Sequence, residues 1–292
     1  SVSAFLLNRS SDLAMLAMEN GFSPCDVAPN VQQTYMVAGQ AWTPRNGSKA
    51  RYGEMVTQKW GLQQSNNWIS AYLMSKLNPQ AFVDLLHEYG TRNPEIHPSM
   101  SLCLGPCDIS VGEMASAYTA FVNHGIRASL MFVTKIEDGE GNVIAQFQPR
   151  MNEVISEESA NKMIYMLKSV VDGGTASRLR FKYNLKGDIG GKTGTTNNNS
   201  DAWFMGILPT LVNACWVGGD DRDIHFNSMA MGQGASGALP IFALYMQQVY
   251  KDEQLGYNEN AIFDLPEGYD PCSFVDESLE EGSEVEIDEL FE

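Results

Sequence analysis

Residues 190–196 read Gly190-Gly191-Lys192-Thr193-Gly194-Thr195-Thr196, so a cation and three hydroxyls lie among glycines that leave the backbone uncovered. After an asparagine-rich turn, residues 201–208 form an apolar run of strand length. Together the two stretches predict a hairpin with the lysine on its edge strand. Alternation along that strand places Lys192 and Gly194 on one face and Thr193 and Thr195 on the other, and free backbone groups there can pair with an extended peptide.

A phosphate-binding loop is the first alternative for a lysine that follows glycines. Such a loop needs the pattern G-x-x-x-x-G-K-[ST], and Lys186 occupies the place of its first glycine. The alternative therefore fails. Lys-Thr-Gly is instead one of three sequence elements found together in serine acyltransferases that react with penicillin-like substrates.

The bulk composition predicts a folded body and an acidic end. A length of 292 residues and a hydrophobic content of 43% suffice for one large domain or two modest ones. Lys251 is the last basic residue, and fifteen acidic residues follow it, which leaves only −2 of the net charge of −17 for the first 251 residues. We interpret residues 251–292 as a flexible acidic tail, and its charge argues against a nucleic-acid partner.

Cysteine and histidine spacing does not support a metal site. The five cysteines form no C-x-x-C pair and the four histidines are scattered, so we expect no metal and no cofactor. Cys103 could form a disulfide with Cys107, one of the two could pair with Cys25, or both could remain buried thiols. No apolar run approaches the roughly 18 residues that a membrane-spanning helix needs.

Apolar periodicity predicts helices in the first half of the chain and strands in the second. Helices are expected to end near Gly21 and to cover residues 54–64, 68–77, 79–89, 110–121, 163–173 and 239–250. Strands are expected over residues 128–136, 143–147, 187–196, 201–208 and 211–218, and residues 23–51 as an extended loop. The fold class is therefore α+β, an antiparallel sheet backed by helices with a helical subdomain and a site where the two halves meet.

Ser65-Asn66-Asn67 interrupts two of these helices. Serine and asparagine at a helix start are good caps, so an isolated run of this kind is explained by capping alone. With the Lys192 strand downstream, a second interpretation gains weight, in which the run and the lysine belong to one site.

Six stretches together resemble the transpeptidase domain of class A penicillin-binding proteins, the bifunctional cell-wall synthases. They are residues 18–24, 42–46, 65–67, 113–118, 192–195 and 201–204. The likeness runs from about residue 16 to residue 250. It divides the chain into an atypical segment 1–15, a transpeptidase domain 16–250 and the acidic tail 251–292.

The resemblance implies acyl transfer, through a serine ester, on the D-Ala-D-Ala end of a peptidoglycan stem peptide, with β-lactam antibiotics entering as mimics. In this family picture Ser65 relays a proton, Asn67 hydrogen-bonds the substrate amide, and Lys192 supplies a positive field. The implied location is the periplasmic side of the bacterial inner membrane, with a membrane anchor in a missing N-terminal part of the full-length protein.

The same resemblance assigns substrate binding to Thr193, Gly194 and Thr195. The threonines would hold the terminal carboxylate, and the backbone N–H of Thr195 would form half of an oxyanion hole.

One family element is absent, namely the nucleophilic Ser-x-x-Lys shortly before Met18. Residues 1–17 contain no lysine, and the chain's one Ser-x-x-Lys, Ser159 to Lys162, falls in a helix that the family uses for packing. We therefore expect this chain to be inactive, through true loss or through a truncated or misread start. Two alternatives stay open: a non-catalytic module that binds cell-wall peptide or a partner, and a D,D-carboxypeptidase or serine β-lactamase.

Overall fold

The computed structural model describes residues 4–5, 9–105, 107–196, 198–221 and 223–272. Its helices are α1 (Arg9–Glu19), α2 (Gln58–Gln63), α3 (Asn67–Ser75), α4 (Pro79–Glu88), η1 (Met100–Leu104), α5 (Val111–Val122), α6 (Glu157–Gly173), α7 (Arg178–Phe181), α8 (Met229–Gly232), α9 (Ala238–Val249) and η2 (Glu253–Leu255). Its strands are β1 (Ala4–Phe5), β2 (Val27–Pro29), β3 (Tyr35–Val37), β4 (Gln40–Trp42), β5 (Met55–Thr57), β6 (Asp108–Ile109), β7 (Ile126–Ala128), β8 (Lys135–Glu137), β9 (Val143–Gln146), β10 (Met151–Glu153), β11 (Gly190–Thr195), β12 (Asp201–Leu208) and β13 (Leu211–Gly218).

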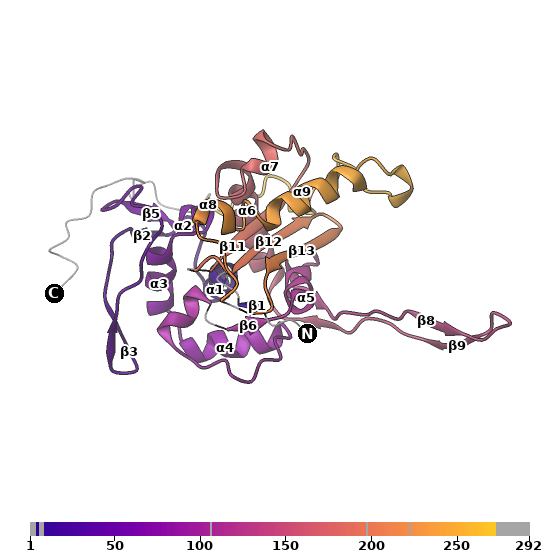
Figure 1. Ribbon diagram of the computed structural model, residues 1–292, viewed down its shortest axis with the longest axis horizontal. Coiled ribbons are helices and arrows are strands. Elements are labelled where there is room, and N and C mark those ends of the chain that lie inside the picture. Colours follow the sequence, from indigo (N-terminus) through magenta and orange to yellow (C-terminus); the bar gives the residue numbers. More distant parts are fainter. Residues whose placement is uncertain (1–3, 6–8, 106, 197, 222, 273–292) are drawn as a thin grey trace.

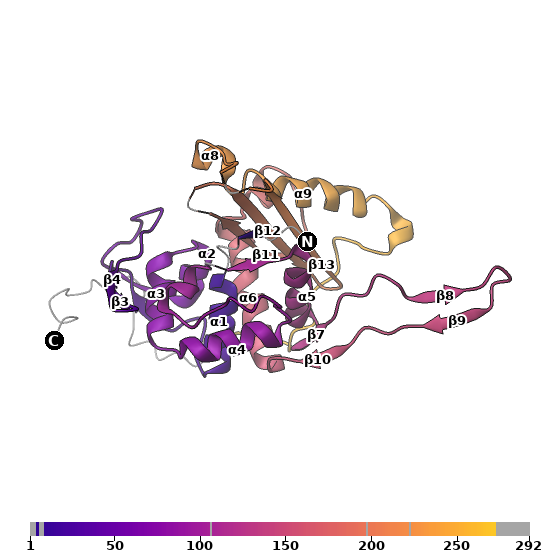
Figure 2. The same cartoon turned by 60° about the horizontal axis from the view of Figure 1, so that its bottom comes forward.

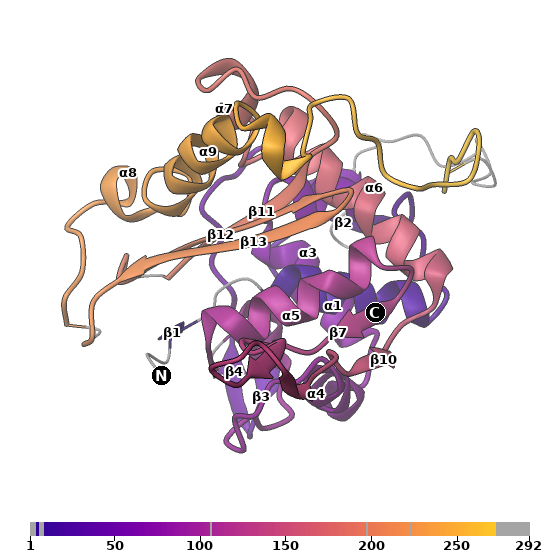
Figure 3. The same cartoon turned by 90° about the vertical axis from the view of Figure 1, so that its right-hand side faces the viewer.

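A three-stranded antiparallel sheet in the order β11-β12-β13 lies between two layers of helices (Figure 3). Helix α9 covers one face, and α5 and α6 cover the other. Every residue of β12 is buried, because this central strand is covered on both faces. Strand β11 is one of the two edge strands, with Lys192 opposite Met205, so the predicted hairpin and the α+β class are confirmed.

Helix α1 lies inside the helical layer (Figure 2) and belongs to the core. All residues from Leu13 to Met18 are at most 6% exposed. An apolar run that is buried on all sides is typical of a central helix. Gly21 follows the helix with a φ of +86°, a backbone conformation that glycine adopts readily. The segment 1–15 that we called atypical therefore contributes, from residue 9 onward, to a packed core element.

The helix predicted over residues 54–64 begins later than expected. Residues Met55–Thr57 form β5, which pairs with β2, and α2 starts only at Gln58. Because Val56 and Thr57 are β-branched and Val56 is fully buried, a strand suits them better than a helical turn. The Thr57 hydroxyl then caps α2 by accepting from the backbone N–H of Trp60 at 3.2 Å.

The extended loop predicted over residues 23–51 contains β2 and a small hairpin, β3–β4. Its turn is made by Ala38 and Gly39, both with positive φ (50° and 79°). The prolines of this segment suggested a loop, but none of them falls inside β3 or β4. The prediction was therefore wrong over these residues.

The hairpin predicted between residues 128 and 147 is present and projects from the body (Figures 1 and 2). The first predicted strand is divided, because β7 ends at Ala128 and pairs with β10, and β8 begins only at Lys135. Apolar side chains of this arm are exposed, among them Phe132 at 89%.

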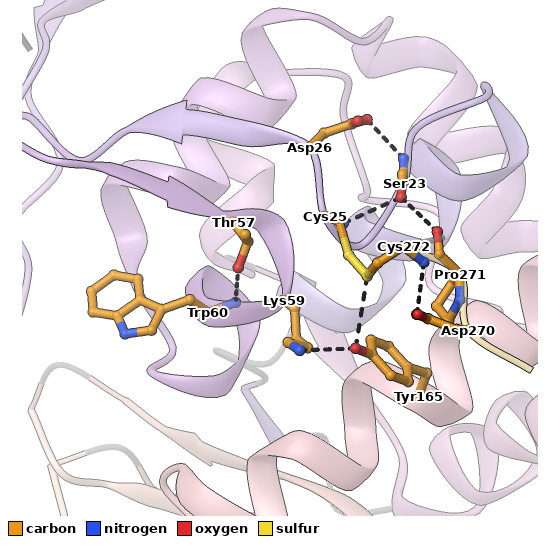
Figure 4. The surroundings of a disulfide bond; sticks show 10 residues. All are labelled: Ser23, Cys25, Asp26, Thr57, Lys59, Trp60, Tyr165, Asp270, Pro271 and Cys272. Carbon is orange, nitrogen blue, oxygen red and sulfur yellow. Dashed lines mark hydrogen bonds between the residues drawn. A yellow bond between two sulfur atoms is a disulfide. The ribbon is translucent and has the colours of Figure 1, made fainter. Parts of the chain in front are cut away.

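Residues 251–272, which we predicted as the start of a flexible tail, are mostly exposed but contact the body at several points. Phe263 is buried and its backbone N–H donates to Asp188 Oδ2 at 3.1 Å. A disulfide joins Cys25 to Cys272 (Figure 4), and Ser23 Oγ donates to the adjacent Pro271 carbonyl at 3.2 Å. The many acidic residues of this segment suggested a solvated tail, so its apolar and cysteine contacts were not predicted. Residues 273–292 lie outside the described residues.

The disulfide excludes one of the cysteine pairings that the sequence left open. Cys25 pairs with Cys272 and so with neither Cys103 nor Cys107. Cys103 is a buried free thiol, whose pKa is raised by burial.

The described ranges hold no cluster of His, Cys, Asp and Glu suited to a metal ion. None of the helices in these ranges is both long enough and apolar enough to span a bilayer.

Candidate active site

The two sequence motifs meet at one cavity of about 650 Å³. Ser65 and Asn67 reach it from the α2–α3 junction, and Thr193 and Thr195 reach it from β11. The sheet half and the helical half of the fold thus each supply one wall. Four of the six residues selected from the sequence line the cavity.

Lys192 does not line the cavity, but it contacts Ser65, which does. Its side chain is 1% exposed, and its Nζ donates hydrogen bonds to Ser65 Oγ and, at 3.0 Å, to the Thr193 carbonyl. Burial lowers the pKa of Lys192 from 10.5 to about 7. Near neutral pH the amine therefore exists in both protonation states, so it can accept a proton as well as donate one.

Ser65 holds its hydroxyl at the cavity through an unusual backbone. Its φ is +52°, in the left-handed region that costs a non-glycine residue about 1–2 kcal/mol. Its N–H donates to the Leu62 carbonyl at 3.1 Å, which closes the end of α2. The strained turn places Ser65 between two helices, within reach of Lys192 on the facing strand.

Asn66 and Asn67 have different roles in the same turn. The Asn66 side chain caps α3, because its Oδ1 accepts from the N–H groups of Trp68 at 2.9 Å and Ile69 at 3.2 Å. The capping interpretation is thus correct for Asn66. Asn67 is the first residue of α3 and lines the cavity.

The Asn67 side chain is oriented by the loop before it. Its Nδ2 donates to the Arg45 carbonyl at 2.7 Å, and its backbone N–H donates to Asn46 Oδ1 at 3.0 Å. Asn67 Oδ1 accepts no hydrogen bond from the described residues, so it is available to accept one from a ligand.

The two threonines of β11 each have a partner from another segment. Thr193 Oγ1 lies 2.7 Å from Thr175 Oγ1, in the turn between α6 and α7. Thr195 Oγ1 accepts from the Gly234 N–H at 2.9 Å. Thr193 and Thr195 line the cavity and Lys192 does not, which agrees with the alternation predicted for an edge strand.

Gly194, selected from the sequence as a substrate-binding residue, is not among the residues that line the cavity. It lies opposite Trp203 in the hairpin, where the backbone at Gly234 passes close to it. A Cβ at Gly234 would lie 2.5 Å from the Gly194 carbonyl oxygen and 2.3 Å from that of Trp203. The two glycines therefore permit a close approach of backbone segments beside Thr195.

Ser159 and Lys162 lie far from this cavity. Ser159 is in the first turn of α6, whereas the cavity is reached just after the helix ends at Gly173. Fourteen residues of α-helix measure about 21 Å. Lys162 pairs with Glu158 on the same helix at 2.7 Å.

Residues 13–220 match the penicillin binding protein transpeptidase domain. This chain belongs to that family. Penicillin-binding protein 1A of Neisseria meningitidis serogroup A is 33% identical over 222 residues, which cover 74% of this chain and 27% of the relative. Penicillin-binding protein 1B of Vibrio cholerae is 34% identical over 209 residues, 72% of this chain and 26% of the relative. The chain therefore spans about a quarter of the length of these relatives.

Solved structures support the same fold. Penicillin-binding protein 1A of Haemophilus influenzae superposes with a TM-score of 0.80 at 25% identity, covering 91% of this chain and 44% of the other. PonA1 of Mycobacterium tuberculosis, in a structure with penicillin V, gives a TM-score of 0.72 at 24% identity, covering 90% and 72%. The resemblance inferred from the six stretches is confirmed at the level of family and fold.

Two residues of this transpeptidase domain that contact the site were not selected from its sequence. Thr175 and Arg178 follow the paired glycines that end α6, and both line the cavity. The available signal was a run of small and hydroxyl residues, Gly-Gly-Thr-Ala-Ser, directly after a long helix. It indicates a turn, but not the strand that the turn contacts.

Proposed function

We propose that this chain carries the peptide-binding site of a peptidoglycan D,D-transpeptidase. The observation that supports this most directly is the hydrogen bond from Lys192 Nζ to Ser65 Oγ, beside a cavity that two threonines and two arginines, Arg45 and Arg178, help to line. The ligands are the D-Ala-D-Ala end of a stem peptide and β-lactam antibiotics. The peptide lies as an added strand along β11, where backbone groups at the sheet edge recognise an extended chain.

Each side chain then has a role set by its contacts. Lys192, with a pKa lowered to about 7, takes the Ser65 proton in its neutral form and returns a proton in its charged form. In a form of the domain that has the serine nucleophile, Ser65 would pass that proton to the nitrogen of the D-alanine, which leaves as the serine ester forms and the peptide bond breaks. Asn67 Oδ1 accepts from the substrate amide N–H.

Carboxylate binding belongs to Thr193 and Thr195, whose hydroxyls can donate to an anion. The backbone N–H of Thr195 forms half of the oxyanion hole. Gly194 contributes through its backbone position between them.

The covalent step needs a serine nucleophile in Ser-x-x-Lys, and residues 1–17 contain no lysine. We therefore propose that this chain binds its ligands reversibly and forms no serine ester. On this proposal the chain belongs to a family of D,D-transpeptidases, but it binds peptide without catalysing the reaction.

Penicillin V provides the test. Calorimetry should detect binding to the chain, and intact-mass spectrometry should detect no adduct. Lys192→Met should abolish binding while keeping a cooperative thermal melt. Absence of binding by the unaltered chain would refute the proposal.

A chimera separates loss of the nucleophile from loss of the site. Replacing residues 1–12 by the matching segment of the Neisseria meningitidis relative should produce a stable adduct with penicillin V. Rapid turnover of that ester would instead favour a β-lactamase or D,D-carboxypeptidase. A chimera that binds penicillin V but is never acylated would favour the non-catalytic module.

We also propose an oxidising location, the periplasmic side of the inner membrane. The disulfide between Cys25 and Cys272 supports it, because such bonds persist in the periplasm and are rare in the cytosol. Thiol labelling of the protein as isolated from its host should leave these two cysteines unmodified. Labelling of both would contradict the proposed location.

A further inference from the structure

One glutamine attaches the end of helix α2 to the end of helix α6. Gln63 is the last residue of α2 and lies two residues before Ser65. Its side-chain Nε2 donates to the Ser169 carbonyl of α6 at 3.0 Å, and its own carbonyl accepts from the Thr175 N–H at 3.2 Å. Gln63 therefore contacts both the last part of α6 and the turn that follows this helix.

The turn after α6 fits closely around Gln63. A Cβ at Gly174 would lie 2.4 Å from the Gln63 carbonyl oxygen and 2.7 Å from its Cγ. A Cβ at Gly173 would lie 3.0 Å from the Gln63 Nε2. The absence of a side chain at these two positions permits the close approach, so the paired glycines that end α6 serve the contact with α2.

The contacts of Gln63 complete a closed ring of hydrogen bonds and backbone beside the cavity. The Thr175 hydroxyl lies 2.7 Å from the Thr193 hydroxyl. The Thr193 carbonyl accepts from Lys192 Nζ, which also donates to Ser65 Oγ. The two halves of the fold are thus joined directly by Ser65 and Lys192. They are joined a second time through Gln63 and Thr175.

The second connection bears on the geometry of the first. Ser65 leaves α2 in a turn with a φ of +52°, and its N–H donates to the Leu62 carbonyl at 3.1 Å, so its position depends on the end of α2. Helix α2 has only 6 residues, and a helix this short depends on tertiary contacts to stay in place. Gln63 supplies such contacts from its last residue to the 17-residue helix α6.

We infer that Gln63 is a positioning residue, which holds the end of α2 against α6 and thereby places the Ser65 hydroxyl between Lys192 and the ligand. Gln63 is not among the described residues that line the cavity, so it acts through its neighbours and not by touching the ligand. The inference rests on the proposed function only where it takes penicillin V as the ligand, because the contact between Ser65 and Lys192 can be followed without one.

The test replaces the amide donor by Gln63→Met, which keeps the length of the side chain. Without the bond to α6, the end of α2 should move away from Lys192 and admit water to the amine. The pKa of Lys192, which burial lowers to about 7, should then rise by about one unit. NMR of the lysine side chains in the ligand-free 292-residue chain measures this pKa. Penicillin V affinity should fall roughly 2- to 10-fold, because the Ser65 hydroxyl is displaced.

Gln247→Met is the matched control. Gln247 lies on α9, is half-buried like Gln63, and also donates from Nε2 to a backbone carbonyl of another segment, that of Tyr183, at 2.8 Å. Both variants should lower the melting temperature by similar amounts, whereas only Gln63→Met should change the Lys192 pKa and the affinity for penicillin V. An equal pKa shift in Gln247→Met would indicate general loosening of the fold and would overturn the inference.

Gly174→Ala tests the same contact from the other side and carries the test if Gln63→Met does not fold. The added Cβ would meet the carbonyl oxygen and Cγ of Gln63, so it should displace this residue and raise the Lys192 pKa as well. Gly139→Ala, where nothing lies within 4 Å of a Cβ, should leave that pKa unchanged.

The outcomes separate this inference from the proposed function. If Gln63→Met, or Gly174→Ala in its place, leaves the Lys192 pKa unchanged, the inference fails and the proposed function stands. If the unaltered chain binds no penicillin V, the proposed function fails, and the comparison of pKa values alone decides the inference.

Discussion

Lys192 Nζ donates a hydrogen bond to Oγ of Ser65, a residue 127 positions earlier in the chain. Lys192 lies on β11, an edge strand of the sheet, and Ser65 lies in a strained turn between two helices. The contact therefore depends on the relative position of the two halves of the fold. The predictions below test that contact and the segments that support it.

Burial of Lys192 should make stability depend on pH. Its pKa is lowered from 10.5 to about 7 in the folded chain, so between these values the unfolded chain binds a proton that the folded chain lacks. Stability contributed by this group therefore rises with pH from about 7 to about 10.5. Lys192→Met removes the effect, so its stability relative to the unaltered chain should be highest near pH 7 and fall toward pH 10.

Denaturant unfolding of both chains at several pH values measures this difference. Since each pKa unit corresponds to about 1.4 kcal/mol, the change should reach a few kcal/mol. Lys251→Met, which removes an exposed lysine, controls for the loss of one positive charge. A stability difference for Lys192→Met that does not vary with pH would show that the lysine is not desolvated.

Thr175→Val should disturb the site without a change in size. The hydroxyl that contacts Thr193 Oγ1 is lost, which should lower the free energy of unfolding by about 1 kcal/mol. Penicillin V binding should also weaken, because Thr193 loses the partner that orients it. Thr210→Val is the matched control on an exposed threonine, and an equal effect there on binding would contradict the role of Thr175.

Gly234→Ala should separate the segment around residue 234 from β11. A Cβ at this position would come within 2.5 Å of two backbone oxygens, which cannot move aside as a flexible side chain can. We expect a loss of stability of about 1–3 kcal/mol and weaker ligand binding, because the hydrogen bond from Gly234 to Thr195 is displaced.

Gly139→Ala is the control for this substitution, since nothing lies within 4 Å of a Cβ there. Thermal melts and calorimetry on both variants measure the effects. Normal binding by Gly234→Ala would mean that the segment does not position Thr195.

Reduction of the disulfide should lower the melting temperature. Cys25 and Cys272 are 247 residues apart, and a cross-link that closes a long loop typically contributes about 2–4 kcal/mol. A reductant should therefore lower the melting temperature by several degrees. The variant with both cysteines replaced by serine should melt at the lower temperature with or without reductant. If reductant leaves the melting temperature of the unaltered chain unchanged, the disulfide does not stabilise the fold.

Sequence patterns predicted the elements whose signal is local. The apolar run of β12 and the glycine-flanked lysine of β11 predicted the hairpin, and the six stretches indicated the family. The β3–β4 hairpin was missed because prolines elsewhere in the segment dominated the interpretation. The disulfide was missed because Cys272 lies in an acidic run that resembles an unfolded tail.

The site was predictable only in part. Ser65, Lys192 and the threonines carry recognisable motifs, so their convergence could be proposed from sequence. Thr175, Arg178 and Gly234 have no such motif. Their contacts join segments that are far apart in sequence, and only the packing of α7 and the segment around residue 234 on β11 brings them together.

The most direct test of the central claim is a crystal structure of the chain with penicillin V bound. The claim predicts the ligand carboxylate within hydrogen-bond distance of the Thr193 and Thr195 hydroxyls, with Ser65 beside the β-lactam ring. Penicillin V bound instead in the separate cavity of about 680 Å³ that Arg92 and Arg127 line would contradict it.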